Sequence, residues 1–218
     1  EPLAQLIEEQ GKALLPLEQL AAMHLDEEKG IATVEDAWQG ACDIVAENIS
    51  DSAEVRKLLR KELWNAGELV SELIIDEKEA PEFLQYRDYS EPVRQLPPHR
   101  ILAMNRGEDK KALKINLRCP DEKLIAKVAQ KLNLKEQSPF YTYYHNALTD
   151  SYKRLLLPSL ERELRNELTE KAEKQAISVF AANLRQLLLT QPISGHTVLG
   201  LDPGYRTGCK TAVIDPNG

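Results

Sequence analysis

The residues whose types could do chemistry lie near the end of the sequence, between positions 197 and 215. An apolar run ends in a single carboxylate, Asp202, and a glycine-containing turn with Arg206 follows it. Lys210 comes next, and a second run of β-prone residues (211–214) comes directly after it. Two such runs joined by this kind of turn predict a β-hairpin. The first strand presents Asp202 at its tip, where a carboxylate can bind a divalent metal ion.

The same turn resembles a phosphate-binding loop, but two features argue against one. The Walker pattern is G-x-x-x-x-G-K-[ST], whereas Cys209 here separates Gly208 from Lys210. A P-loop also leads into a helix, whose N-terminus binds the phosphate, and residues 212–214 are strand-like instead. The hairpin of actin-like ATPases, whose turn amides cradle a phosphate, remains open on the pattern alone.

A metal-dependent nuclease is the third interpretation of the hairpin. Cleavage of a phosphodiester by two metal ions requires several carboxylates, and no partner acid for Asp202 is identifiable. Asp215 lies at the far end of the neighbouring strand and is typical of a turn. The three cysteines form no C-x-x-C and the four histidines no H-E-x-x-H, so zinc is not indicated. We expect no cofactor, and Asp202 is a metal ligand only if the nuclease alternative holds.

Charge is distributed unevenly along the 218 residues, whose net charge is −7. Residues 1–86 hold 7 basic and 20 acidic side chains, residues 87–118 hold 8 and 4, and residues 119–218 hold 13 and 11. Phosphates attract clusters of Lys and Arg, so the middle segment is a candidate for nucleic-acid contact, with solvated helix faces as the competing interpretation. The candidate binding residues are Arg94, His99, Arg100, Arg106, Lys110, Lys111 and Lys114, with Arg206 and Lys210 of the hairpin.

Two further groups have both a functional and a structural interpretation. His99 and Arg100 could contact phosphate or a neighbouring domain, but a histidine and an arginine at a helix start also pack locally, which we favour. The aromatic residues between positions 140 and 144 could stack on bases. Aromatic side chains one to four positions apart on a helix more often fill a core, and we expect that here.

Hydrophobic spacing predicts that most of the chain is helical. Residues 34–49 place their apolar side chains on one stripe, with Thr33 as the N-cap. Residues 50–52 break this helix and cap a second one from residue 53 to about residue 64, and Gly67 ends that one. The elements that precede the hairpin are therefore expected to form a helical scaffold.

A small β element is predicted in the middle of the chain. Residues 112–118 alternate apolar and polar side chains, which is typical of a half-buried strand, and residues 69–75 favour a second strand. Residues 81–98 contain four prolines and are expected to be irregular. Residues 99–106 predict a short helix with Gly107 as its C-cap.

The second half of the chain returns to a helical pattern. A helix is predicted from residue 120 to about residue 132, and the aromatic residues lie on another that begins after Pro139. Pro158 is expected to interrupt that helix. Residues 159–189 then predict one long, charged helix, and residues 190–195 a linker into the hairpin.

Composition places further limits on the class of protein. Hydrophobic content of 42% and charged content of 29% are typical of a globular domain, and no apolar run is long enough to cross a membrane. No signal peptide is visible. The three cysteines are odd in number and far apart, which indicates no disulfide framework, so a reducing cytoplasm is the expected location. The first residue is Glu1 rather than methionine, and we expect a fragment of a longer protein.

The hairpin sequence at residues 199–213, LGLDPGYRTGCKTAV, resembles the opening of the YqgF-type, ribonuclease-H-like domain of the Tex family of transcription accessory proteins. Other segments resemble the same family, namely AWQGACDIVAENIS at 37–50, RDY at 87–89 and PHRILAMNRGE at 98–108. The strand at 112–117 and the long helix also match in order. The resemblance covers nearly the whole chain.

The resemblance implies a mainly α fold: a helical central region at residues 1–190 with a small β element at about 67–118. Residues 191–218 would be a linker and the first hairpin of a ribonuclease-H-like α/β domain. The family implies a non-catalytic scaffold that binds nucleic acid, chiefly RNA through a C-terminal OB-fold outside this chain, and works with the transcription machinery. The alternative is a ribonuclease-H-like nuclease that uses Asp202.

Overall fold

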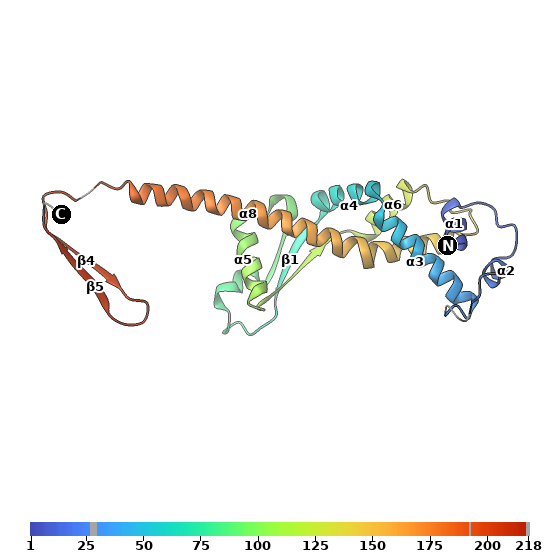
Figure 1. Cartoon of the computed structure of the whole chain (residues 1–218), viewed down its shortest axis with the longest axis horizontal. Coiled ribbons are helices and arrows are strands. Elements are labelled where there is room, and N and C mark those ends of the chain that lie inside the picture. Colours follow the sequence, from blue (N-terminus) through green and yellow to red (C-terminus); the bar gives the residue numbers. More distant parts are fainter. Residues whose placement is uncertain (27–29, 192, 217–218) are drawn as a thin grey trace. The chain divides into compact units, whose positions relative to one another are not determined.

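The computed structural model describes residues 1–26, 30–191 and 193–216 (Figure 1). The chain divides into two compact units, Glu1–Gln175 and Ala176–Gly218. The helices are α1 (Pro2–Glu9), α2 (Leu17–Ala22), α3 (Val34–Asp51), α4 (Ala53–Ala66), α5 (Pro98–Asp109), α6 (Asp121–Lys131), α7 (Tyr141–Asp150) and α8 (Leu157–Leu188). The strands are β1 (Glu68–Leu73), β2 (Asp88–Pro92), β3 (Leu113–Arg118), β4 (Val198–Pro203) and β5 (Cys209–Ile214). The fold is mainly α with two small antiparallel sheets, as the sequence predicted.

The break between α3 and α4 confirms the capping pattern expected from the sequence. The Thr33 side chain accepts a hydrogen bond from the Asp36 backbone N–H at 3.1 Å, and the Asp36 carboxylate accepts one from the Thr33 N–H at 2.9 Å. This reciprocal pair is a capping box. Ser52 ends α3 and caps α4, and Gly67 follows the last turn of α4. Local hydrogen-bonding side chains therefore define where both helices begin.

The three-stranded sheet has the order β2-β1-β3, with both pairs antiparallel. β3 alternates buried and exposed residues along its whole length, which confirms the predicted half-buried strand. β1 is the central strand, and its Ser71 is fully buried and donates a hydrogen bond to the Tyr86 carbonyl at 2.7 Å. The buried face of the sheet packs toward α5 and the 3₁₀ turn η2 (Pro81–Tyr86).

β2 corrects one expectation, because residues 81–98 are not irregular throughout. Residues 88–92 pair with β1 over five positions, from Asp88 opposite Glu72 to Pro92 opposite Glu68. β2 is an edge strand, where proline is tolerated because its missing N–H removes no bond from the centre of the sheet. The remaining residues form η2 and a second 3₁₀ turn, η3 (Val93–Gln95). Proline content therefore marked an edge of the sheet rather than a loop.

Gly107 is not the C-cap of α5, which is a second correction. The helix continues to Asp109, and the left-handed residue that follows it is Lys111, with φ of 56°. Gly107 is buried, and a Cβ atom placed on it would lie 2.5 Å from Leu113 Cδ1 and 3.2 Å from Phe83 Cδ1. The glycine is needed because α5 approaches β3 and η2 closely at this point.

Pro158 does not interrupt the helical chain, which is a third correction. α7 continues through the π-helical segment η4 (Ser151–Leu156) directly into α8, so the backbone stays helical from Tyr141 to Leu188. Proline lacks an N–H and its ring crowds the preceding turn of a helix. The wider π turn lies directly before Pro158 and gives the ring room, so the helix passes the proline without ending.

One hydrophobic core joins the helices and the sheet of the first unit. α8 contributes a buried stripe at every fourth position, namely Leu160, Leu164, Leu168 and Ala172. Ion pairs on the surface link neighbouring helices, each contributing at most about 1 kcal/mol at an exposed site. They join α4 to α8 through Arg56–Glu163 and Arg60–Glu167, and α4 to α6 through Glu62–Lys127 and Glu54–Lys131.

The second unit holds the end of α8 and the predicted hairpin of β4 and β5, which is confirmed. Apolar side chains lie on both faces of the hairpin. Leu199 pairs with Val213 on one face, and Val198 pairs with Ile214 on the other. Leu199 and Val213 are 59% and 69% exposed. Strands that are apolar on both faces are typical of α/β sheets covered by helices on both sides.

Candidate nucleic-acid interface

The first candidate residues lie at the N-terminal end of α5. Arg94 in η3 and His99 in the first turn of α5 are both exposed. Arg100 points to β2 and donates hydrogen bonds to the Tyr89 hydroxyl at 2.7 Å and to a Glu91 carboxylate oxygen at 3.0 Å. Its guanidinium also lies 5.2 Å from the centre of the Tyr89 ring. Arg100 therefore has a local role in joining α5 to β2, while Arg94 and His99 face solvent.

A second group lies at the C-terminal end of α5. Arg106, Lys110 and Lys111 are exposed, and Lys110 pairs with Glu82 at 2.9 Å while lying over the Phe83 ring at 5.4 Å. An α-helix rises 1.5 Å per residue, so Arg106 lies about 9 Å and Lys110 about 15 Å along the axis from Arg100. The seven candidates of the middle segment therefore do not form one cluster, but two groups at opposite ends of a helix together with Lys114.

Lys114 lies on the exposed face of the sheet, where acidic residues oppose the basic ones. The register places Lys114 opposite Glu72 and Arg118 opposite Glu68. Glu72 also lies opposite Asp88 of β2. Opposite charges on facing positions stabilise a sheet, and they also neutralise each other. This face therefore presents mixed rather than positive charge.

A groove of about 820 Å³ between α5 and α8 brings in arginines that the sequence analysis missed. Arg106 lines it from α5, and Arg162 and Arg165 line it from α8. Arg165 forms an ion pair with Glu108, whereas no carboxylate partner is recorded for Arg106 or Arg162 among the described residues. In the sequence, only the helical periodicity of residues 159–189 could have indicated that these arginines share a surface. That periodicity places positions 162, 165 and 169 near one another on one side of α8.

Acidic side chains line the same groove, namely Glu108, Asp109, Glu161 and Glu173. Glu161 accepts a hydrogen bond from the Leu117 backbone N–H at 3.0 Å, so it holds α8 against β3. Three arginines facing four carboxylates give no net positive field. The groove alone is therefore not a strong site for a phosphate chain.

The hairpin places Asp202 directly opposite Lys210, on the same face of the strand pair. The turn between them is closed by a hydrogen bond from the Gly204 N–H to the Gly208 carbonyl at 2.9 Å, and Arg206 lies in that turn. An ammonium facing Asp202 competes with a cation for the carboxylate. Within the described ranges, no group of three or more His, Cys, Asp or Glu side chains is placed to hold a metal ion.

Cys119, Asp121 and Tyr152 form a polar cluster that the sequence analysis did not single out. The Tyr152 hydroxyl donates to Asp121 Oδ1 at 2.7 Å and lies 3.3 Å from Cys119 Sγ. Burial raises the pKa of the Cys119 thiol to about 11 and also raises the pKa of the Tyr152 hydroxyl. Both groups stay protonated at neutral pH, and a protonated thiol is a poor nucleophile. The cluster thus connects η4 to the start of α6.

The aromatic group of α7 belongs mainly to the core. Phe140 and Tyr144 are 1% and 6% exposed, so neither can stack on a base. Tyr143 stacks on Trp38 of α3 with ring centres 4.2 Å apart, and Trp38 is itself buried. The structural interpretation of these residues is correct.

Comparison with known proteins decides the family. The Tex central region-like family model matches residues 13–180, and the Tex protein YqgF-like domain matches residues 196–218. The chain belongs to the Tex family. The two matched regions follow the order that the sequence resemblance predicted. Arg94, the α5 candidates and Lys114 lie in the Tex central region, and Asp202, Arg206 and Lys210 lie in the YqgF-like region.

Relatives of the Tex-family chain come from bacteria and from humans. The YdcI protein of Bacillus subtilis is 42% identical over 200 residues, which cover 91% of this chain and 28% of the relative. Transcriptional accessory protein Tex of Neisseria gonorrhoeae is 38% identical over 188 residues, which cover 84% of this chain and 25% of the relative. Human S1 RNA-binding domain-containing protein 1 is 36% identical over 201 residues, which cover 86% of this chain and 20% of the relative. The chain thus spans about a quarter of the length of these relatives. Among the described residues, none of the helices combines the length and the apolar composition that crossing a bilayer requires.

Proposed function

We propose that this chain supplies a non-catalytic scaffold that binds nucleic acid, RNA or DNA, within a transcription accessory protein of the Tex family that binds RNA chiefly through parts outside this chain. The observation that carries the proposal is the ordered match to the Tex central region and the YqgF-like domain in one chain. One relative is named a transcriptional accessory protein and another is named for an S1 RNA-binding domain. We also propose that the protein acts in the cytoplasm and contacts the transcription machinery.

The register of the hairpin supports a non-catalytic role. Two-metal cleavage needs several carboxylates around the reacting phosphate. Asp202 faces Lys210 across the strand pair instead of a second acid. An ammonium at that place can contact a phosphate but cannot hold a metal ion, because Lys offers donors and no acceptor.

Charge pairing supports assigning the proposed binding to the cations that have no acidic partner. Arg100 and Lys110 form ion pairs with Glu91 and Glu82, so their charge is largely neutralised. No ion pair is recorded for Arg94, Arg106 or Lys111 in the part of the chain that the structure describes. These three exposed cations are distributed along α5 and its flanks. They can therefore contact about three phosphates of an extended strand, and they give affinity without sequence preference.

Fluorescence anisotropy with a labelled single-stranded RNA tests this part of the proposal. Each phosphate contact on a single strand contributes about 0.7 to the slope of log affinity against log salt. Three contacts predict a slope of about −2, and affinity that falls roughly 20-fold between about 50 and 200 mM salt. The triple variant Arg94→Gln, Arg106→Gln and Lys111→Gln is expected to remove most of that dependence.

A matched triple variant at Lys127, Lys131 and Lys171 controls for net charge. Each of these lysines pairs with a glutamate, so their replacement by Gln changes the charge equally at sites already neutralised. The control is expected to keep most of the affinity. Equal losses in the two triple variants, or binding that does not depend on salt, would contradict the assignment of the three cations.

A further inference from the structure

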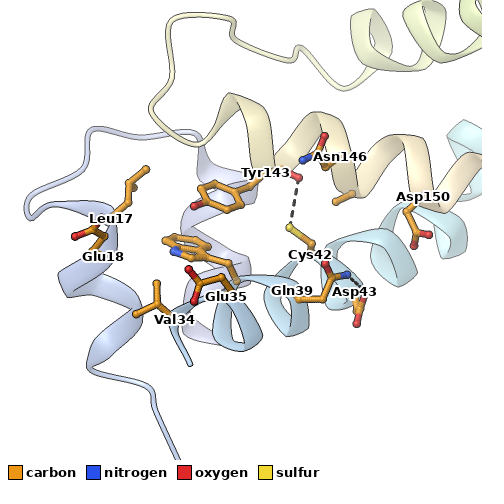
Figure 2. Close-up of a pocket in the computed structure, with 12 residues that line it drawn as sticks. Leu17, Glu18, Val34, Glu35, Gln39, Cys42, Asp43, Tyr143, Asn146 and Asp150 are labelled. Carbon is orange, nitrogen blue, oxygen red and sulfur yellow. Dashed lines mark hydrogen bonds between the residues drawn. The ribbon is translucent and has the colours of Figure 1, made fainter. Parts of the chain in front are cut away.

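A pocket of about 570 Å³ opens between α2, α3 and α7, away from the basic residues of α5 (Figure 2). Leu17 and Glu18 line it from α2, Val34, Glu35 and Trp38 from α3, and Tyr143 from α7. Figure 2 shows Leu17 and Tyr143 on one side of the space and Val34 and Glu35 on another. Its volume lies within the range of about 300–1,000 Å³ that is typical of sites for small ligands or for a few peptide side chains.

The aromatic floor of the pocket has an unused hydrogen-bond donor. Trp38 is only 4% exposed and stacks on Tyr143 at 4.2 Å. Its indole N–H has no hydrogen-bond acceptor among the described residues, and the indole nitrogen keeps some access to solvent. The N–H is therefore open to a visiting acceptor. Buried Trp N–H groups normally have a partner, so an acceptor supplied by a ligand would complete this one.

The rim of the pocket is acidic and its charges are not all neutralised. Glu18, Glu35, Asp43 and Asp150 line it, and no Lys, Arg or His does so among the described residues. Arg154 pairs with Asp150, and the Gln39 amide donates to Asp43 at 2.9 Å. No cation pairs with Glu18 or Glu35 within the described ranges. Burial, then the nearby Cys42, Glu35 and Glu18, raise the pKa of the Tyr143 hydroxyl.

We propose that this pocket binds a segment of a partner protein in which an arginine lies between apolar residues. The guanidinium would stack beside Tyr143 and pair with Glu18 and Glu35, because a planar cation suits both an aromatic ring and a carboxylate. The Trp38 N–H would donate to a backbone carbonyl of the segment. Leu17 and Val34 would contact the apolar neighbours of the arginine.

Charge complementarity separates this site from the nucleic-acid function proposed above. Glu18, Glu35 and Asp43 form no ion pair with a Lys or Arg among the described residues, so the pocket repels a phosphate chain and disfavours RNA. A Tex-family protein with both surfaces could hold nucleic acid on one and a basic protein segment on the other. The pocket proposal stands on contacts of α2, α3 and α7 and does not depend on the proposed RNA contacts.

The test uses the full chain labelled with ¹⁵N and the probe peptide acetyl-Gly-Leu-Arg-Leu-Gly-amide. The same peptide with citrulline in place of arginine keeps the shape and removes the charge. The chain has two tryptophans, and the Trp64→Phe variant assigns the indole signal of Trp38. Addition of the arginine peptide is expected to shift the Trp38 indole signal and the amides of residues 34–43, and the citrulline peptide is expected to shift them much less.

The double variant Glu18→Gln with Glu35→Gln is expected to weaken binding of the arginine peptide by about fivefold or more, since two attractive charges are lost. Glu9→Gln with Asp51→Asn makes the same change of charge at exposed sites outside the pocket and is expected to leave binding unchanged. Circular dichroism confirms that both variants are folded. The proposal fails if the two peptides bind equally, if the shifts lie elsewhere, if both double variants weaken binding equally, or if the arginine peptide does not bind.

Discussion

Replacement of the helical glycines Gly107 and Gly40 by alanine is predicted to change stability in opposite directions. Alanine is favoured over glycine in a helix interior by about 1 kcal/mol. At Gly40 in α3, nothing lies within 4 Å of a new Cβ atom, so the full gain is expected. At Gly107 in α5, the new atom would lie 2.5 Å from Leu113 Cδ1 and 2.7 Å from Leu113 Cγ. Leu113 is 2% exposed and belongs to the hydrophobic core, so any shift of its side chain disturbs the core residues around it.

Overpacking of a closely packed core costs about 1–3 kcal/mol, which exceeds the helix-propensity gain. Gly107→Ala is therefore expected to destabilise the protein by about 1 kcal/mol, and Gly40→Ala to stabilise it by about 1 kcal/mol. Urea titration followed by circular dichroism measures both, with midpoint shifts of roughly 0.5 M in opposite directions. Equal stabilisation by both substitutions would show that α5 does not lie as close to β3 as the structure places it.

Three further predictions concern other parts of the chain. Tyr152→Phe removes a buried hydroxyl that donates a hydrogen bond to the Asp121 carboxylate. The substitution is expected to lower the free energy of unfolding, measured by urea titration, by about 1.5–3 kcal/mol. A loss below about 0.5 kcal/mol, roughly the error of the method, would contradict this hydrogen bond. Burial raises the pKa of Cys42 and Cys119 to about 11, so both thiols stay protonated at pH 8. A disulfide reagent is therefore expected to label the exposed Cys209 first. Labelling of Cys42 and Cys119 is expected to become faster as the pH approaches 11. A two-stranded hairpin is marginal by itself, so the amides of β4 in a dilute monomer are expected to exchange quickly unless the hairpin docks or pairs with another molecule; strong protection without either contact would refute this.

Local signals in the sequence predicted the elements whose ends are defined by neighbouring residues. Thr33 and Ser52 cap α3 and α4, and strict alternation identified β3. Tertiary contacts decided the rest. Gly107 looked like a helix end because its close contact with Leu113 is not visible in the sequence. Pro158 looked like a break because a π-helical segment leaves no composition signal.

The candidate interface was predictable as a list of charges but not as a surface. Composition identified the basic middle segment, yet Arg100 and Lys110 are paired with acids from β2 and η2 that lie nearby only in the fold. Arg162 and Arg165 were missed because they follow Arg106 by more than 50 residues in the sequence. They reach the groove only because α8 packs beside α5. The acidic pocket was missed for the same reason, since Glu18, Glu35 and Tyr143 come from three separate helices.

The central claim, that the chain binds RNA without cleaving it, is tested by one measurement on a doubly labelled single-stranded RNA. The full chain is incubated in excess with this RNA in Mg²⁺ or Mn²⁺ at low salt, while anisotropy reports binding and the loss of energy transfer between the labels reports cleavage. The prediction is a rise in anisotropy with undiminished energy transfer, because Asp202 faces Lys210 rather than a second acid. Cleavage that requires the metal ion and disappears in Asp202→Asn would contradict the claim and establish the nuclease alternative.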